Sequence, residues 1–133
     1  MKPKVYIETT VVSYQTGRFS RDMVIAGHQQ STRAFWDLLN GTLDPFVSAL
    51  VLKEASGGDP AVAAKRLRVI EEFPDDALHI AIASTTGMDY IVTWNFSHIN
   101  NPFTIAKIRN TVEEAGYVCP EIVSPEAFLG EET

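Results

Sequence analysis

The stretch "DDALHIAIASTTGMDYIVTWN", residues 75 to 95, joins a helix to a strand and decides the class of the fold. Its first half is rich in alanine, leucine and isoleucine, so we expect a helix that is buried on most sides. Gly87 marks the end of this helix. The second half, "DYIVTWN", combines β-branched and aromatic residues and predicts a strand. A helix followed at once by a strand indicates a domain in which the two alternate.

The N-terminal part of the chain continues this alternation. "KVYIET" predicts a short strand from Lys4 to Glu8, and "TTVVSYQTG" predicts a helical turn that ends at Gly17. In "SRDMVIAGHQQSTRAFWDLLNG" the apolar residues recur at helical spacing. We expect Ser20 to cap the start of this helix and Gly41 to mark its end.

The middle and the C-terminal part repeat the pattern. "DPFVSALVLKEASGG" predicts a strand that begins at Phe46, turns helical near Leu50 and stops at Gly57 and Gly58. We expect a further helix over residues 59–72, another in "PFTIAKIRNTVEEAG" and a final strand in "YVCPEIVSP". Strands that alternate with helices imply a parallel sheet covered on both faces. The predicted fold class is therefore α/β.

Length and composition indicate a single domain over residues 1–133 with a sizeable core. Hydrophobic residues make up 45% and charged residues 21%, which is ordinary for a globular protein. The net charge of −6 argues against non-specific adhesion to nucleic acid or membrane, although a local basic rim still allows a nucleic-acid substrate. The single Cys119 permits no internal disulfide, and no apolar run approaches the roughly 18 residues of a membrane helix. We expect a cytoplasmic protein.

Four oxygen-bearing residues fall where such a fold binds ligands, beyond the carboxyl ends of the strands. Glu8 ends the first predicted strand and Asn95 ends "DYIVTWN". Asp76 stands at the start of the buried helix, and Glu54 lies on the short helix after "FVSA". Carboxylates that gather without a neutralising Lys or Arg repel one another unless a cation is present. Oxygen-only ligands suit Mg²⁺ or Mn²⁺, which would activate water for phosphodiester hydrolysis.

Four motifs, "YIETT", "VSALVLKEA", "DALHIAIA" and "DYIVTWNFSHI", occur in an order that resembles the PIN domain. Within that superfamily the chain resembles the VapC-type toxins of bacterial type II toxin–antitoxin systems, over nearly its whole length. The resemblance implies a three-layer α/β/α domain with a mostly parallel sheet, acting as an Mg²⁺- or Mn²⁺-dependent endoribonuclease. It also implies a small antitoxin partner and a homodimer. On this resemblance Glu8, Glu54 and Asp76 match the metal-binding acids, and Asn95 matches a fourth catalytic position.

The chain departs from that family pattern at two places. His98 stands near a point where many relatives carry Asp, which would leave the metal site one carboxylate short. Only 21 residues lie between Glu54 and Asp76, where relatives usually carry another strand and helix. Either the domain is shortened between these two helices, or part of the native chain is absent at this point; a shortened domain would have a thinned sheet or an exposed strand edge that invites pairing with another chain.

Residues outside the acidic set are weaker candidates for substrate binding, namely Thr9, Arg18, Arg21 and His98. The two arginines follow the first helix in a polar loop, where a guanidinium group can meet a phosphate or remain solvated.

Each stronger candidate also has a structural interpretation. Asp75 and Asp76 can cap their helix and interact with its dipole, and each effect is worth roughly 0.5–1 kcal/mol. Glu8 can be an ordinary acid at a strand end, Glu54 can belong to a solvated helix face, and Asn95 can be a turn residue. His79 lies three residues after Asp76, near the same helix face, and we expect it to pack and hydrogen-bond in the interior.

Two other classes of function remain open. One is a PIN-like domain with weak or no catalysis that acts as a binding or regulatory partner. The other is an unrelated α/β domain, such as a small phosphatase or a nucleotide-binding module. The lack of a P-loop or a "GxGxxG" motif counts against the latter.

Overall fold

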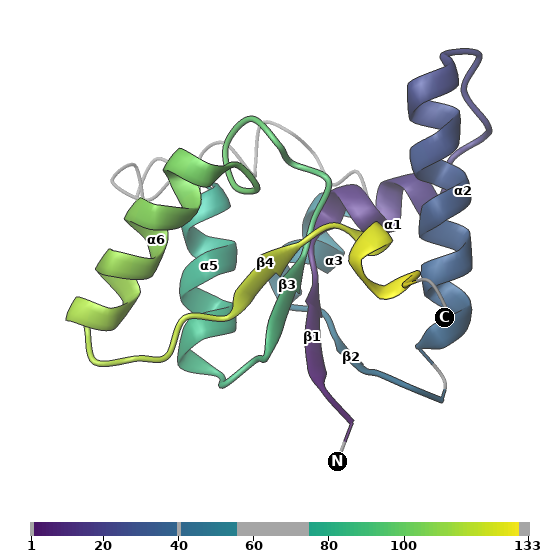
Figure 1. Cartoon of the computed structure of the whole chain (residues 1–133). Coiled ribbons are helices and arrows are strands. Elements are labelled where there is room, and N and C mark those ends of the chain that lie inside the picture. The colour runs from purple at the N-terminus through teal and green to yellow at the C-terminus, as the bar shows by residue number, and fades with distance from the viewer. Residues whose placement is uncertain (1, 40, 56–74, 131–133) are drawn as a thin grey trace.

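The computed structural model describes the backbone of residues 2–39, 41–55 and 75–130, and their side chains except those of residues 53, 55 and 75–77. Helices and strands alternate along this part of the chain (Figure 1). The elements are β1 (Lys4–Ile7), α1 (Thr9–Thr16), α2 (Met23–Leu38), β2 (Asp44–Phe46), α3 (Ala49–Ala55), α5 (Asp75–Thr85), β3 (Tyr90–Val92), α6 (Pro102–Glu114), β4 (Glu121–Val123) and the 3₁₀ helix η1 (Pro125–Phe128).

The four described strands form one parallel sheet in the order β2-β1-β3-β4. β1 pairs with β2 on one side and with β3 on the other, and β4 pairs with β3. Because all four strands run in the same direction, their carboxyl ends lie along a single edge of the sheet. This confirms the predicted α/β class and the parallel sheet.

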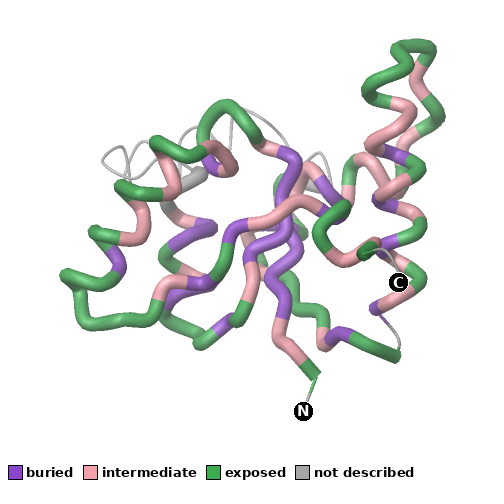
Figure 2. The backbone as a smooth tube through the Cα atoms, viewed as in Figure 1, coloured by how far each residue is buried: buried purple, intermediate pink, exposed green. Residues whose placement is uncertain are grey.

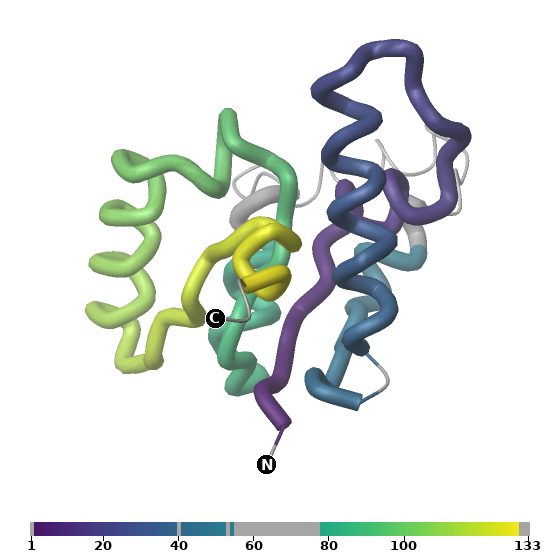
Figure 3. The backbone as a smooth tube through the Cα atoms, turned by 45° about the vertical axis from the view of Figure 1, so that its right-hand side comes forward, coloured from purple at the N-terminus to yellow at the C-terminus, as the bar shows by residue number. Residues whose placement is uncertain are grey.

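The sheet is covered on both faces by helices. Successive residues of β1 point to opposite faces, so Tyr6 joins one core cluster while Val5 and Ile7 join the other. The first cluster adds residues of α3, α5 and α6, and the second adds residues of α1 and α2. Figures 1 and 3 show α5 and α6 on one side of the sheet and α2 on the other. The buried residues concentrate on the central strands (Figure 2). The arrangement is compatible with three α/β/α layers.

The start of α2 differs from the prediction. The N-cap is Asp22, whose Oδ1 accepts the N–H groups of Val24 at 2.9 Å and Ile25 at 3.1 Å. The hydroxyl of Ser20 instead accepts the N–H of Asp22 at 3.0 Å. The expected cap at Ser20 was wrong. Ser20 and Asp22 both have side chains that can cap a helix, and it is Asp22 that reaches the N–H groups of the first turn of α2. Gly41 lies in the turn after the helix, where its N–H donates to the carbonyl of Leu38.

Two strand boundaries also differ. β2 ends at Phe46, where the prediction began its strand, because Ser48 accepts the N–H of Val51 at 3.2 Å and starts α3. β3 ends at Val92, so Asn95 lies three residues beyond the strand. There the Thr93 hydroxyl accepts the Asn95 N–H at 3.0 Å and turns the chain.

Helix α5 is buried along one side. His79, Ile80, Ala83 and Ser84 are buried, whereas Ala81 and Thr85 are exposed. The expectation of burial on most sides was therefore too strong. Gly87 adopts a φ of 73° after the helix, a conformation that favours glycine, as expected for a helix end.

Several predictions concern residues outside those described. These are the stop at Gly57 and Gly58, the helix over residues 59–72, the shortening before Asp76 and the capping by the Asp75 side chain. Within the described part of the chain, no helix is both long enough and apolar enough to span a bilayer.

Candidate functional site

The first candidate, Glu8, lies where β1 passes into α1 and is only 4% exposed. It is the N-cap of α1, because its Oε1 accepts the N–H of Thr10 at 3.0 Å. The same oxygen accepts the hydroxyl protons of Thr10 and of Thr93, the latter at 2.8 Å. All three donors contact Oε1, so the carboxylate is held firmly through one of its two oxygens.

The two threonine hydroxyls also connect Glu8 to the segment that follows β3. The Thr10 hydroxyl accepts the N–H of Trp94 at 2.9 Å. The Thr93 hydroxyl accepts the N–H of Asn95 at 3.0 Å. Each hydroxyl therefore donates to Glu8 and accepts from the backbone beyond β3. This brings Asn95 close to Glu8, although they are far apart in the sequence.

Asn95 also organises the turn in which it lies. Its Oδ1 accepts the N–H of His98 at 2.9 Å, and its carbonyl accepts the N–H groups of Ile99 and Asn100. These contacts match the structural interpretation of Asn95 as a turn residue. They also fix its position at the carboxyl edge of the sheet.

The second acid, Glu54, lies on α3 with 29% of its side chain exposed. Its Oε1 accepts the hydroxyl proton of Thr9 at 2.7 Å, and it lies 2.8 Å from Nε2 of His79. Thr9 follows Glu8 directly in the chain, so this contact brings the two acids to the same end of the sheet. Thr9, expected to bind substrate, thus contacts a carboxylate within the protein.

Tyr6 is buried in β1, two residues before Glu8. The pKa of its hydroxyl is raised to about 12, chiefly because the residue is buried; the hydrogen bond with Ser48 opposes this rise, and the negative charges of Glu54 and Glu8 add to it. The tyrosine is therefore neutral at physiological pH. Its pKa responds to both carboxylates, which is consistent with their lying near one another.

The third acid, Asp76, belongs to the first turn of α5, one turn before His79. Its side chain lies outside the described part of the structure. His79 itself is 1% exposed and hydrogen-bonded, which confirms its expected place in the interior.

The donor chemistry of the described acids fits a hard cation. Glu8 and Glu54 offer only oxygen, and the hydrogen bonds that the described residues make to each of them converge on Oε1 rather than Oε2. No group of three or more His, Cys, Asp or Glu side chains suited to a metal occurs among the described residues. Two of the three expected ligands can thus be placed.

The other candidates for substrate binding, Arg18, Arg21 and His98, make no described side-chain contact with Glu8 or Glu54. Arg18 and Arg21 are exposed in the loop between α1 and α2. None of the hydrogen bonds or ion pairs found among the described residues joins either side chain to Glu8 or Glu54. His98 is exposed in the turn that follows Asn95.

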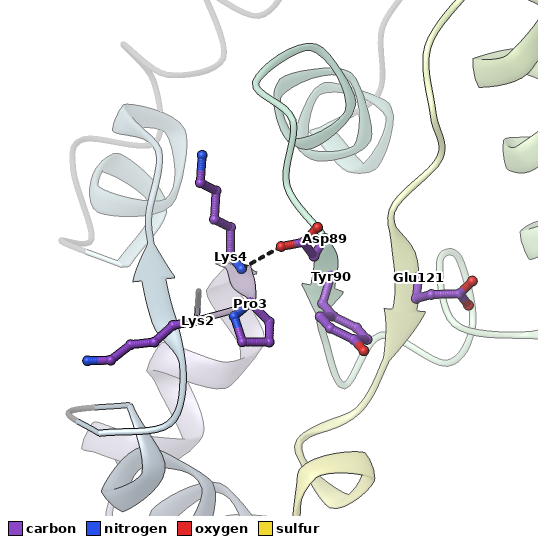
Figure 4. Close-up of a pocket in the computed structure, with 6 residues that line it drawn as sticks. All are labelled: Lys2, Pro3, Lys4, Asp89, Tyr90 and Glu121. Atoms are coloured by element: carbon purple, nitrogen blue, oxygen red, sulfur yellow. Dashed lines mark hydrogen bonds between the residues drawn. The ribbon is translucent and has the colours of Figure 1, made fainter.

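A pocket of about 510 Å³ lies at the opposite edge of the sheet, beside the amino ends of β1, β3 and β4 (Figure 4). The Oδ2 atom of Asp89 accepts the backbone N–H of Lys4 at 2.8 Å there. The charged ends of Lys2, Lys4 and Glu121 point in different directions. Because no cluster of charges converges on this open pocket, we do not regard it as the functional site.

Three residues that hold the site were not identified as functional from the sequence, namely Tyr6, Thr10 and Thr93. A signal was present for the threonines, because each follows a strand end within a motif that also contains a candidate residue, "YIETT" and "TWN". Tyr6 carried no such signal, since it alternates with apolar residues in a strand. Burial raises the pKa of the Cys119 thiol, which disfavours its thiolate form.

No protein-family model matches the chain, and searches of curated proteins and of solved structures also give no match.

Proposed function

We propose that this chain is an Mg²⁺- or Mn²⁺-dependent endoribonuclease that hydrolyses RNA phosphodiester bonds, as the toxin of a toxin–antitoxin pair. One observation supports this best. Glu8 and Glu54, from different elements, lie at the carboxyl edge of a parallel sheet, and the described residues that bond to each of them do so at Oε1. That edge is where open parallel sheets bind ligands.

The chain's own residues would hold and orient the reacting groups. Glu8 and Glu54 would bind the cation through their second oxygens, and Asp76 at the start of α5 would complete the acidic set. The threonine hydroxyls at Glu8 restrict the rotation of that carboxylate before any ligand arrives. Asn95, linked to Glu8 through Thr93, would belong to the same catalytic group at this edge of the sheet.

A bound Mg²⁺ or Mn²⁺ would lower the pKa of a coordinated water and neutralise charge on the phosphate. This chemistry needs no nucleophilic side chain from the protein.

A catalytically weak PIN-like domain is the second candidate. His98 and the short segment between Glu54 and Asp76 favour it, because both would reduce the number of acids around a cation. The retained Glu8 and Glu54 favour the enzyme.

The proposal extends to partners and location. An antitoxin segment would dock over the acidic site and contribute a basic side chain that pairs with the carboxylates. The protein would act in the cytoplasm as a homodimer.

The experiment that tests the activity compares Asp76→Asn with Asp75→Asn. Asn keeps the shape and the capping oxygen of Asp but loses the charge that binds a cation. With a mixed RNA pool and Mn²⁺, we expect the wild type and Asp75→Asn to cleave and Asp76→Asn to be inactive.

Thermal unfolding with and without Mn²⁺ provides the accompanying control. Stabilisation by Mn²⁺ should vanish in Asp76→Asn and persist in Asp75→Asn. A wild type that cleaves no RNA at any Mn²⁺ concentration would favour the binding-domain alternative. Cleavage that survives in Asp76→Asn would remove this residue from the mechanism.

A further inference from the structure

A continuous chain of polar side chains runs from the sheet to Glu54. The hydroxyls of Ser48 and Tyr6 lie 2.7 Å apart, and the Tyr6 hydroxyl lies 2.5 Å from Nδ1 of His79. Nε2 of His79 lies 2.8 Å from Oε1 of Glu54. Tyr6 and His79 are 2% and 1% exposed, so these hydrogen bonds lie in a largely desolvated environment, where each is stronger than in water. We call these four residues the relay.

The carboxylate of Glu54 and a neutral imidazole at His79 together set the direction of every hydrogen bond in the relay. A carboxylate only accepts, so Nε2 of His79 must carry the proton that it shares with Glu54. In the neutral imidazole Nδ1 then accepts, so the Tyr6 hydroxyl donates to it. The Tyr6 oxygen is left to accept the hydroxyl proton of Ser48, whose own oxygen accepts the Val51 N–H at 3.2 Å. Every hydroxyl in the relay is satisfied.

The donation to Glu54 does not depend on the charge of His79. If the imidazole were protonated on both nitrogens, Nε2 would still donate to Glu54 and only the Tyr6 and Ser48 protons would reorient. The relay therefore holds Glu54 in either state.

The relay ends on Glu54, which is more exposed than Glu8, the other candidate metal ligand whose side chain the structure describes. Glu54 lies on a helix of seven residues, where a long carboxylate side chain would otherwise sample several rotamers. His79 from α5 and Thr9 from α1 both donate to its Oε1. Tyr6 packs its ring edge against His79, with centroids 5.6 Å apart, and so restricts the rotation of the imidazole. Oε2 of Glu54 is thereby left with a defined direction.

We infer that His79 is a positioning residue, which holds Glu54 so that Oε2 faces a divalent cation, and that Tyr6 and Ser48 fix the His79 ring. This inference rests on the proposed metal-dependent function. A purely structural role would need only the volume of the imidazole. The inference instead requires its Nε2–H group, and this difference can be tested.

The first experiment measures Mn²⁺ affinity by calorimetry on the full chain. His79→Leu keeps approximately the volume of the side chain but removes its N–H donor. We expect it to lower the Mn²⁺ affinity at least about tenfold, as is typical when a residue that hydrogen-bonds a metal ligand is lost. His79→Gln restores an N–H donor, and we expect its affinity to stay within about threefold of the wild type. Ser84→Ala is the matched control, because Ser84 is buried in the same helix and its hydroxyl has no partner among the described residues.

Two results would overturn the inference. One is a His79→Leu variant that binds Mn²⁺ as tightly as the wild type. The other is a His79→Gln variant that binds as weakly as His79→Leu, since volume would then be the only requirement. If His79→Leu does not fold, Tyr6→Phe tests the inference in its place, because this substitution removes the hydroxyl that bonds His79 and keeps the aromatic ring. We expect Tyr6→Phe to lower the affinity at least about threefold, and an unchanged affinity would refute the inference.

A second measurement needs no metal. Nitrogen NMR of the metal-free protein should show a protonated Nε2 at His79, assigned by its loss in His79→Gln, and Glu54→Ala should shift that signal because its acceptor is gone. An unprotonated Nε2 would overturn the relay. A protonated Nε2 in a protein that binds no Mn²⁺ would overturn the metal-dependent function and with it the role toward a cation, while the His79–Glu54 contact would stand.

Discussion

At the scale of the residue, Glu8 combines a structural and a proposed functional role. Its Oε1 caps α1 and accepts the buried hydroxyl of Thr93, contacts that a glutamine oxygen can also make. We expect Glu8→Gln to lose less than about 1 kcal/mol of unfolding free energy, because its hydrogen bonds persist. We expect Glu8→Ala to lose about 2 kcal/mol or more, since the cap is lost and the Thr93 hydroxyl is left unpaired. Urea denaturation of the two variants measures both values.

The Glu8→Gln variant also distinguishes the structural role of Glu8 from its proposed role in catalysis. Glu8→Gln should abolish Mn²⁺-dependent RNA cleavage while remaining folded, because only the negative charge has changed. A Glu8→Gln protein with wild-type cleavage would mean that Glu8 is a helix cap and nothing more.

At the scale of the element, a helix start depends on which capping side chain meets the first turn. Asp22 accepts two N–H groups of α2, whereas the Ser20 hydroxyl accepts one N–H outside the helix. We expect Asp22→Ala to cost about 1 kcal/mol of unfolding free energy. Ser20→Ala should cost less than about half of that, because no orphan N–H of the helix loses its partner.

Chemical denaturation of the two alanine variants provides the comparison, with Asp22→Asn as the control that keeps a capping oxygen. Equal losses for Ser20→Ala and Asp22→Ala would contradict the assignment of the cap.

At the scale of the whole molecule, exposed apolar surface favours self-association. The first turn of α2 exposes three successive apolar residues, with Met23 at 88%, Val24 at 66% and Ile25 at 37%. In Figure 2 this end of α2 is largely exposed and extends away from the sheet. Contiguous apolar surface of this kind marks interaction sites. We expect a homodimer of about twice the 14.7 kDa chain mass by light scattering at micromolar concentration.

Val24→Asp should shift the mass toward the monomer, because it places a charge within this patch. Val118→Asp is the matched control, since Val118 is 87% exposed in the segment before β4, on a different part of the chain. A wild-type mass near that of one chain would refute the dimer.

The sequence by itself determined the order of the elements and the class of the fold. Composition separates "DDALHIAIAST" from "YIV" as a helix and a strand, because alanine and leucine favour helices whereas β-branched and aromatic residues favour strands. Alternating helices and strands then require a parallel sheet, since a helical crossover returns the chain in the same direction. The same rule indicated the carboxyl edge of the sheet, and it correctly predicted that Glu8, Glu54 and Asn95 would lie there.

Only the tertiary structure decided which partners these residues have. Hydrogen bonds such as Thr93 to Glu8 and His79 to Glu54 join residues far apart in the chain, and no local pattern encodes them. The limits of β2 and β3 depend on Ser48 and Thr93, whose hydroxyls compete with the sheet for backbone N–H groups. The 3₁₀ helix η1 was not predicted, because it packs against α2 and has little periodicity of its own. Periodicity is a property of a segment, whereas a hydrogen-bond partner is a property of the folded chain.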